Sequence, residues 1–118
     1  WDAGMRSLLG ISTAGDHKDG CMQDVHWPGG AFGYFPTYTL GAMTAAQLFA
    51  AARRALPAVD ADLERGDFTA LNGWLRSHVW SRASVLDTDQ LLREATGKAL
   101  SAEDFERHLL RRYAREPA

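Results

Sequence analysis

Cysteine, charge in the first half and alternating apolar residues are all scarce in this chain of 118 residues. Cys21 is the only cysteine, which excludes an internal disulfide and is typical of a reducing compartment. The lack of apolar–polar alternation argues against a sheet, so we predict an all-α protein. The N-terminus has no basic stretch followed by an apolar one, so we expect no secretory signal and a cytoplasmic protein.

Charge is placed unevenly along the chain. The net formal charge of −2 gives no reason to expect nucleic acid or a membrane surface as a partner. The first 58 residues hold four acids and four bases, the last 60 hold eleven acids and nine bases, and Val25 to Ala52 carry no charge. We therefore expect residues 1–58 to form a cleft-lining loop and a buried helix covered by protein outside this chain. Residues 59–118 should form amphipathic helices with a solvated face.

Glycine and proline divide the chain into predicted helices. Met5 to Leu9 should end a helix at Gly10, and a short helical turn is possible between Cys21 and Trp27. Pro36 should begin a long helix that runs to about Leu56. This helix is apolar on every side, but Gln47 and three threonines interrupt it too often for a membrane span.

The second half is predicted to hold short amphipathic helices. They are expected at residues 60–65, at 68–80 after an Asp67 cap, and at 90–96 between a cap at Asp87 or Thr88 and a stop at Gly97. The segment 101–104 resembles a capping box for a final helix. The side chains expected on the inward face of that helix are Phe105, Leu109, Leu110 and Tyr113.

A dense group of hydrogen-bonding side chains lies between Gly20 and Tyr38. Residues 20–27 read Gly-x-x-Gln-Asp-x-His-Trp, which resembles the signature of the carboxypeptidase Taq family of zinc metallocarboxypeptidases. The segments that look like the continuation of that family are Gly33 to Tyr38, Leu40-Gly41, Ala45 to Phe49 and Thr96 to Tyr113. The similarity covers essentially the whole chain and is densest from Gly20 to Phe49.

The resemblance also identifies what this chain does not carry. The family holds its metal with a His-Glu-x-x-His helix and a further Glu, and neither pattern occurs here. The implied molecule is a mainly helical gluzincin-like metallopeptidase of which this chain is the C-terminal portion. Zinc or another divalent metal, the general base and the arginine for the substrate carboxylate are then expected on the missing N-terminal part, and no residue of this chain is expected to bind the metal.

The resemblance further implies roles for residues of the motif in removing single residues from peptide C-termini. Tyr38, with Tyr34 as its competitor, is expected to donate a hydrogen bond to the oxyanion, and His26 to the oxyanion or a substrate carbonyl. Substrate binding is expected from His26, Tyr34 and Gln23. Asp24 and Gln23 should hold these groups in place, with Trp27 packed beside them.

Less specific interpretations of the same residues remain open. Tyr34, Tyr38 and His26 can be core side chains with satisfied polar atoms, and Asp24 can cap a helical turn. A metal cluster of His17, Asp19, Cys21, Asp24 and His26 is disfavoured, because Asp19-Gly20 is typical of a turn and the family's ligands lie elsewhere. A catalytic Cys21 thiol is disfavoured, because no base beyond His26 is placed for it and the matching family position is variable and apolar. The alternative function is a non-catalytic helical interaction or dimerisation module. Family members are typically homodimers, so a homodimer is also expected.

Overall fold

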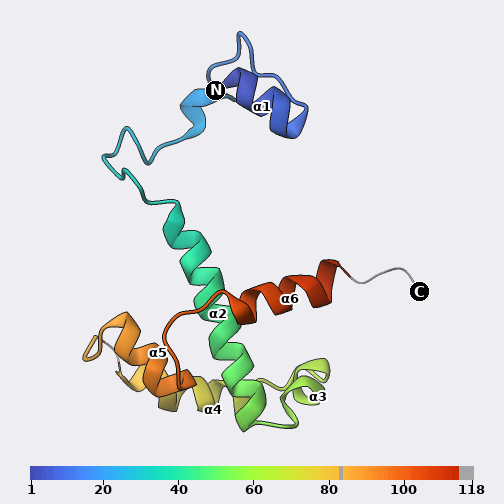
Figure 1. The fold of residues 1–118 in the computed structure, drawn as a ribbon, viewed down its shortest axis with the longest axis vertical. Helices are drawn as coiled ribbons and strands as arrows, with labels where there is room; N and C mark the ends of the chain where they lie inside the picture. Colours follow the sequence, from blue (N-terminus) through green and yellow to red (C-terminus); the bar gives the residue numbers. More distant parts are fainter. Residues whose placement is uncertain (83, 115–118) are drawn as a thin grey trace. The chain divides into compact units, whose positions relative to one another are not determined.

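The computed structural model describes residues 1–82 and 84–114, and every regular element in them is a helix (Figure 1). The predicted all-α class is therefore confirmed. The chain forms two units, Trp1–Pro36 and Thr37–Ala118. From the sequence we expected the boundary between two parts at residue 58, because charged residues become more frequent after it. The observed division comes earlier, because the buried residues of the long helix pack against helices that follow it.

The first unit contains one α-helix and a long loop. Helix α1 (Asp2–Leu9) ends at Gly10, whose φ of 70° is the left-handed conformation of a helix stop, as predicted. The Asp2 carboxylate accepts hydrogen bonds from the Thr13 N–H at 2.8 Å and the Ser12 hydroxyl at 2.9 Å. The returning loop is thereby tied to the start of the helix.

The loop then turns through the short 3₁₀ helix η1 (Cys21–Gln23). The helical turn considered for 21–27 is therefore limited to its first three residues. In this unit only Gly20 is fully buried, and large apolar side chains are open to solvent, including Trp1 at 65%, Met22 at 73% and Trp27 at 59% exposure. A segment of 36 residues without a core of its own cannot bury enough apolar surface to be stable alone.

The second unit is built around helix α2 (Pro36–Ala55), which begins at Pro36 as predicted. The elements that follow are α3 (Val59–Glu64), α4 (Thr69–His78), the 3₁₀ helix η2 (Trp80–Arg82), α5 (Thr88–Thr96) and α6 (Glu103–Tyr113). None of the helices described is long and apolar enough to cross a membrane. Within these residues, α2 buries Gln47, Ala51 and Ala52. The burial predicted for the rest of this helix stays a prediction about the whole enzyme.

The core of the second unit lies where α2 crosses α4. Ala51 and Ala52 pack with Trp74, and half-buried side chains surround them, namely Leu48, Leu56, Leu71, Leu75 and Ala95. The two alanines are small, so the indole of Trp74 can approach the α2 backbone closely. Part of the apolar surface predicted for this helix, at Ala51 and Ala52, therefore makes a specific contact with one aromatic ring.

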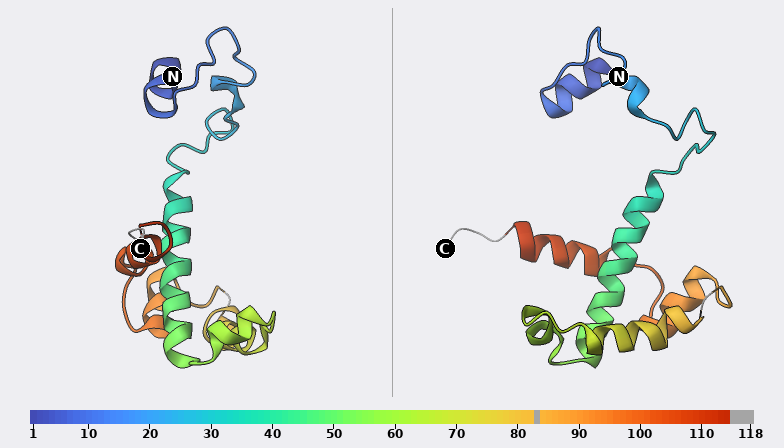
Figure 2. Two further views of the ribbon diagram at one scale, coloured as in Figure 1. Left: turned by 90° about the vertical axis from the view of Figure 1, so that its right-hand side faces the viewer. Right: turned by 180° about the vertical axis from the view of Figure 1, so that it is seen from behind.

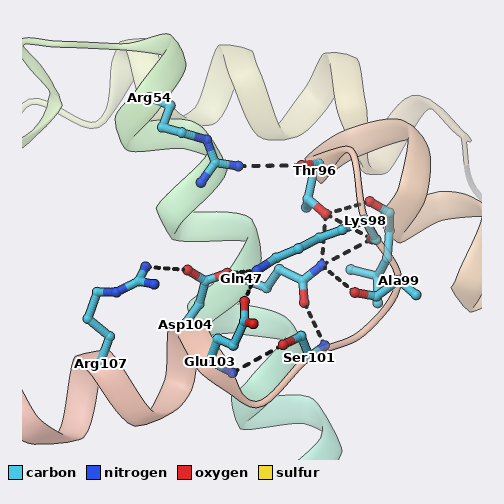
Figure 3. Close-up of polar contacts among 10 residues, drawn as sticks. Gln47, Arg54, Thr96, Lys98, Ala99, Ser101, Glu103, Asp104 and Arg107 are labelled. Carbon is cyan, nitrogen blue, oxygen red and sulfur yellow. Dashed lines mark hydrogen bonds and ion pairs between the residues drawn. The ribbon is translucent and has the colours of Figure 1, made fainter.

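Gln47 fixes the connection between α5 and α6 against α2 (Figure 3). Its side chain is fully buried. The Gln47 Nε2 group donates toward Thr96 Oγ1 at 2.8 Å, the Ala99 carbonyl at 3.1 Å and the Lys98 carbonyl at 3.2 Å. The Ser101 N–H donates to Gln47 Oε1 at 3.0 Å. One amide thus satisfies backbone groups that would otherwise be buried without partners.

The helix ends match the sequence in part. Asp87 and Gln90 form the capping box of α5, and Gly97 stops that helix in the left-handed conformation at φ 83°. Helix α4 begins at Thr69 and ends at His78, two residues before the predicted end at Trp80. Its N-cap is Phe68, which has no side-chain cap. The Asp67 carboxylate accepts a hydrogen bond from the Thr69 N–H at 2.9 Å and so satisfies a backbone donor at the start of the helix.

The capping box predicted at 101–104 is wrong. The N-cap of α6 is Ala102, without a side-chain cap, and the Ser101 hydroxyl accepts the Glu103 N–H at 3.2 Å. The buried Asp104 carboxylate pairs instead with Arg107 at 2.8 Å and Lys98 at 3.2 Å. It cannot reach back to close a box, because these cations hold it on the side of the helix that faces α2.

The inward face predicted for α6 is also not buried in this chain. Phe105 is half-buried, whereas Leu109, Leu110 and Tyr113 are exposed at 38%, 55% and 72%. Figures 1 and 2 show why: α6 starts beside the middle of α2 and then extends away from it. The three apolar side chains of its last turns therefore remain open to solvent in the part of the chain described.

Replacing Gln47 by leucine should destabilise the fold strongly. The substitution keeps the volume but leaves the Ala99 carbonyl and the Ser101 N–H without a partner, whereas the Lys98 carbonyl keeps the hydrogen bond from the Thr96 hydroxyl. Because an unsatisfied buried polar group costs about 1–3 kcal/mol, we expect a loss of roughly 3 kcal/mol in the free energy of unfolding. Urea unfolding followed by circular dichroism measures it. The exposed Asn72 on α4 is the matched control, since Asn72→Leu should change stability by less than about 0.5 kcal/mol; equal effects would contradict the assignment.

Candidate functional site

Gly20 sets the geometry of the loop that carries the site. A Cβ atom at this position would lie 2.7 Å from both the Asp16 carbonyl and the Thr13 hydroxyl oxygen. Only glycine fits, because these contacts are too short for a real side chain. The first glycine of the Gly-x-x-Gln-Asp-x-His-Trp motif therefore serves to close the loop that leads into η1.

Asp24 organises the residues that follow η1. Its Oδ1 atom accepts the His26 N–H at 3.0 Å and lies 2.8 Å from His26 Nδ1, and its Oδ2 atom accepts the Trp27 N–H at 3.3 Å. A side chain that takes up the next backbone donors competes with helix formation, which explains why η1 ends at Gln23. Asp24 thus positions both the backbone and the ring of His26.

The same contacts keep Asp24 ionised. The backbone N–H of His26 contributes most, and the ring of His26 next, to a pKa of the Asp24 carboxyl below its ordinary value. The ionised carboxylate can therefore accept a hydrogen bond from the Nδ1–H group of His26, which fixes the orientation of the imidazole. With Nδ1 turned to Asp24, the chemistry of this ring toward a ligand falls to Nε2.

The imidazole of His26 lies among aromatic rings. It stacks on Tyr34 with ring centroids 5.2 Å apart and an interplanar angle of 21°, and it meets Phe35 at 4.8 Å. The loop returns because the Ala31 N–H donates to the His26 carbonyl at 2.7 Å, and Gly33 adopts a left-handed φ of 70°. The Tyr34 ring thereby reaches His26 although eight positions separate them in the sequence.

Gln23 and Trp27 occupy different surroundings. The Nε2 group of Gln23 donates to the Lys18 carbonyl at 2.9 Å and to Asp19 Oδ1 at 3.3 Å, so it stabilises the loop before η1. Trp27 packs on Phe32 with ring centroids 5.6 Å apart. Gln23 thus holds the loop before η1, whereas its expected roles in holding the catalytic side chains and in substrate binding stay predictions.

An open, mostly apolar hollow of about 560 Å³ lies beside Asp24. It is lined by Trp1, Cys21, Met22, Asp24, Trp27, Pro28 and Phe35, all of the first unit. The side chains of His26 and Tyr34 are also accessible, at 29% and 44% exposure. The rings of the motif are therefore not sealed in an interior of this unit.

The structure brings Asp24, His26 and Tyr34 together, while Tyr38 belongs to the other unit. Tyr38 lies in the first turn of α2 and is 56% exposed. Two residues that contribute to the site, Phe35 and Trp1, were not predicted from the sequence. Phe35 could have been noticed from its place between Tyr34 and Pro36 in the uncharged stretch. The position of Trp1 depends on the hydrogen bond from its indole N–H to Thr13 Oγ1 at 3.3 Å, which leaves no sequence signal.

Residues 1–82 and 84–114 contain no group of three or more His, Cys, Asp or Glu side chains placed to hold a metal ion. His17 Nδ1 lies 4.0 Å from the Cys21 sulfur, a contact of two groups only. The donor set described here does not fit a metal site on its own.

Comparison with known proteins places these residues in a wider context. The family described as carboxypeptidase Taq (M32) metallopeptidase matches residues 1–113. Thermostable carboxypeptidase 1 of Thermus thermophilus is 42% identical over 114 residues, which cover 97% of this chain and 22% of that protein. Carboxypeptidase 1 of Bacillus subtilis is 39% identical over 114 residues, with coverage of 97% and 23%.

Solved structures give the same result. Trypanosoma cruzi metallocarboxypeptidase 1 is 50% identical with a TM-score of 0.84, and the alignment covers 98% of this chain and 24% of that one. The M32 carboxypeptidase of Deinococcus radiodurans is 38% identical with a TM-score of 0.81, covering 97% and 23%. This chain spans less than a quarter of the length of these relatives, which agrees with the expectation that it corresponds to one portion of a longer enzyme.

Titration of Asp24 should reveal the hydrogen bonds that hold His26. Since they lower the pKa of its carboxyl, Asp24 should protonate below the ordinary value of about 3.9. The stabilisation that it gives the folded loop is then complete above that ordinary value and is lost as the pH falls through the lowered pKa. Carbon-detected NMR of the carboxyl measures it. His26→Ala should reverse the shift only in part, because the backbone N–H remains; an ordinary pKa in the unsubstituted protein would contradict the geometry.

Proposed function

This chain belongs to the carboxypeptidase Taq (M32) metallopeptidase family, and we propose that it furnishes the substrate-facing wall of a metal-dependent enzyme that removes single residues from peptide C-termini. The observation that carries the proposal is the cluster of Asp24, His26 and Tyr34. A carboxylate fixes an imidazole at 2.8 Å, and a phenol ring stacks on that imidazole at 5.2 Å. Both rings are accessible to solvent, and the carboxylate of Asp24 also lines an open hollow.

The proposed chemistry uses these groups as hydrogen-bond donors. Hydrolysis of a peptide bond develops negative charge on the carbonyl oxygen, and preorganised donors aimed at that oxygen lower the barrier. We assign the main donor role to the hydroxyl of Tyr38 and a second one to the hydroxyl of Tyr34. His26 donates to the same oxygen or to a substrate carbonyl from Nε2, because Nδ1 faces the Asp24 carboxylate.

The metal ion belongs to the proposal as well. A divalent ion, with zinc as the proposed identity, would polarise the carbonyl and activate water when bound. Because the residues described here do not fit a metal site, its ligands and the general base are assigned to the part of the enzyme outside this chain. The proposed enzyme is a cytoplasmic homodimer that acts on peptides. The accessible aromatic groups of the first unit are then the surface that the rest of the enzyme and the substrate cover.

The alternative function, a non-catalytic interaction module, gives no reason for the observed geometry. A module that only binds through apolar surface does not need a carboxylate, an imidazole and a phenol converging at one loop. The contacts of Asp24 with His26 and of His26 with Tyr34 therefore favour the peptidase wall.

In the full-length enzyme, Tyr38→Phe should lower kcat by about 10²–10³ while the metal content stays unchanged, because one oxyanion donor is lost. Tyr34→Phe should show a similar but smaller effect. Steady-state kinetics with a short peptide, together with metal analysis, measures both. Tyr113→Phe, a matched change at a tyrosine on α6, should leave kcat unaltered. Turnover of Tyr38→Phe equal to that of the unsubstituted enzyme would remove Tyr38 from the mechanism.

Asp24→Asn should act through the orientation of His26. Asparagine has one oxygen in place of two, so it can keep the contacts of Oδ1 with His26 but loses the acceptor that Oδ2 offers to the Trp27 N–H. We expect kcat to fall by about tenfold to a hundredfold, since the hydrogen-bonding partner of a functional histidine typically contributes that much. Full turnover of Asp24→Asn would show that Asp24 has only a structural role.

A further inference from the structure

Helix α6 is anchored at its start, and the apolar side chains of its last turns are exposed. Lys98, Arg107 and the Gln47 network hold its first turn against α2, and only Asp104 is buried (Figure 3). Leu109, Leu110 and Tyr113 are exposed. A helix of 11 residues is marginal on its own in water, so its last turns need a neighbour to remain ordered.

Arginines gather in the groove between this helix and α2. Two adjoining hollows, of about 260 Å³ and 220 Å³, share Arg53, His108 and Arg111. The first also has Arg54, Arg107 and an apolar floor of Ala46, Phe49 and Ala50, and the second has Arg112. We call this surface the α2–α6 groove.

Carboxylates neutralise only part of this charge. Arg53 pairs with Asp60 at 2.7 Å, and Arg107 pairs with Asp104 at 2.8 Å, a carboxylate that it shares with Lys98. Arg54 donates to the Thr96 carbonyl at 3.4 Å. Among residues 1–82 and 84–114, no carboxylate lies within 4.0 Å of Arg111 or Arg112. Five guanidinium groups thus face two carboxylates, which leaves a basic surface with an apolar floor.

We propose that the α2–α6 groove seats an acidic segment from the part of the same enzyme that lies outside this chain, with Leu109, Leu110 and Tyr113 covered by apolar residues of that part. Arginine forks match carboxylates, and desolvation by the covering segment strengthens such pairs. This inference rests on the proposed function in one respect, that the chain is a portion of a larger enzyme.

The observations favour this occupant over two others. A small free anion needs buried donors that converge on one point, whereas these arginines line two shallow hollows along a helix. A second molecule, the partner subunit of the proposed homodimer included, binds from solution at the concentration of the enzyme. More than three quarters of the length of the relatives lies outside this chain, so in such an enzyme the remaining polypeptide is at high effective concentration beside the groove.

Hydrogen exchange in the intact enzyme tests the proposal. The amides of 103–113 should be protected in the unsubstituted enzyme. Arg111→Glu should raise their exchange about tenfold at low salt and less at 1 M salt, because screening weakens the lost pairs. Arg111→Lys should keep most of the protection. Arg76→Glu, on α4 and outside the groove, should leave the exchange of 103–113 unchanged.

Three outcomes would overturn the proposal. The first is exchange of 103–113 that is equal in the Arg111→Glu and unsubstituted enzymes. The second is protection that rises with enzyme concentration, which would mean that a second molecule fills the groove. The third is rapid exchange of 103–113 in the unsubstituted enzyme that slows only when poly-glutamate peptide is added, which would mean that no segment of the same polypeptide fills the groove. The readout does not depend on catalysis, so an enzyme without peptidase activity would contradict the proposed function and still give a clear answer here.

Discussion

The second unit depends on one buried amide. Gln47 has no solvent exposure, and its two polar atoms bond with Thr96, Lys98, Ala99 and Ser101. The segment that joins α5 to α6 has no regular structure to satisfy its own backbone, so it can lie against α2 only if a side chain supplies the partners. That position in turn places Lys98 and Asp104 for the ion pairs that start α6. The direction of the last helix, and hence the groove that it forms with α2, follows from this single side chain.

The first unit depends on the Asp24 carboxylate in a comparable way. Three donors from two residues converge on it, which stops η1 and turns the His26 ring toward Tyr34 and Phe35. Because this unit buries no apolar side chain completely, its conformation is held by polar contacts and glycine geometry rather than by a core. Such a loop suits a surface that must present chemical groups, provided that a larger protein covers its aromatic side chains.

Local signals in the sequence predicted most of the helices. The signals at Gly10, Pro36, Asp87 and Gly97 mark helix ends through backbone geometry that depends on a few neighbouring residues. The signals failed where a distant partner decides the outcome. Ser101 and Asp104 looked like a capping box, but Gln47, Lys98 and Arg107 use their polar groups. The apolar residues of α6 were recognised, yet periodicity alone cannot tell what covers them. In the site, the motif pointed to Asp24, His26 and Tyr34, whereas the contact of Phe35 with the imidazole arises from the return of the loop at Gly33.

We propose that this chain presents a phenol and an imidazole to a peptide held by the whole enzyme. The most direct test is a crystal structure of the full-length enzyme with a non-hydrolysable peptide analogue bound. We expect His26 Nε2 and a hydroxyl of Tyr34 or Tyr38 to lie within about 3.2 Å of the oxygen atoms at the cleavage point. Finding these side chains packed against protein, with no polar atom near the analogue, would contradict it.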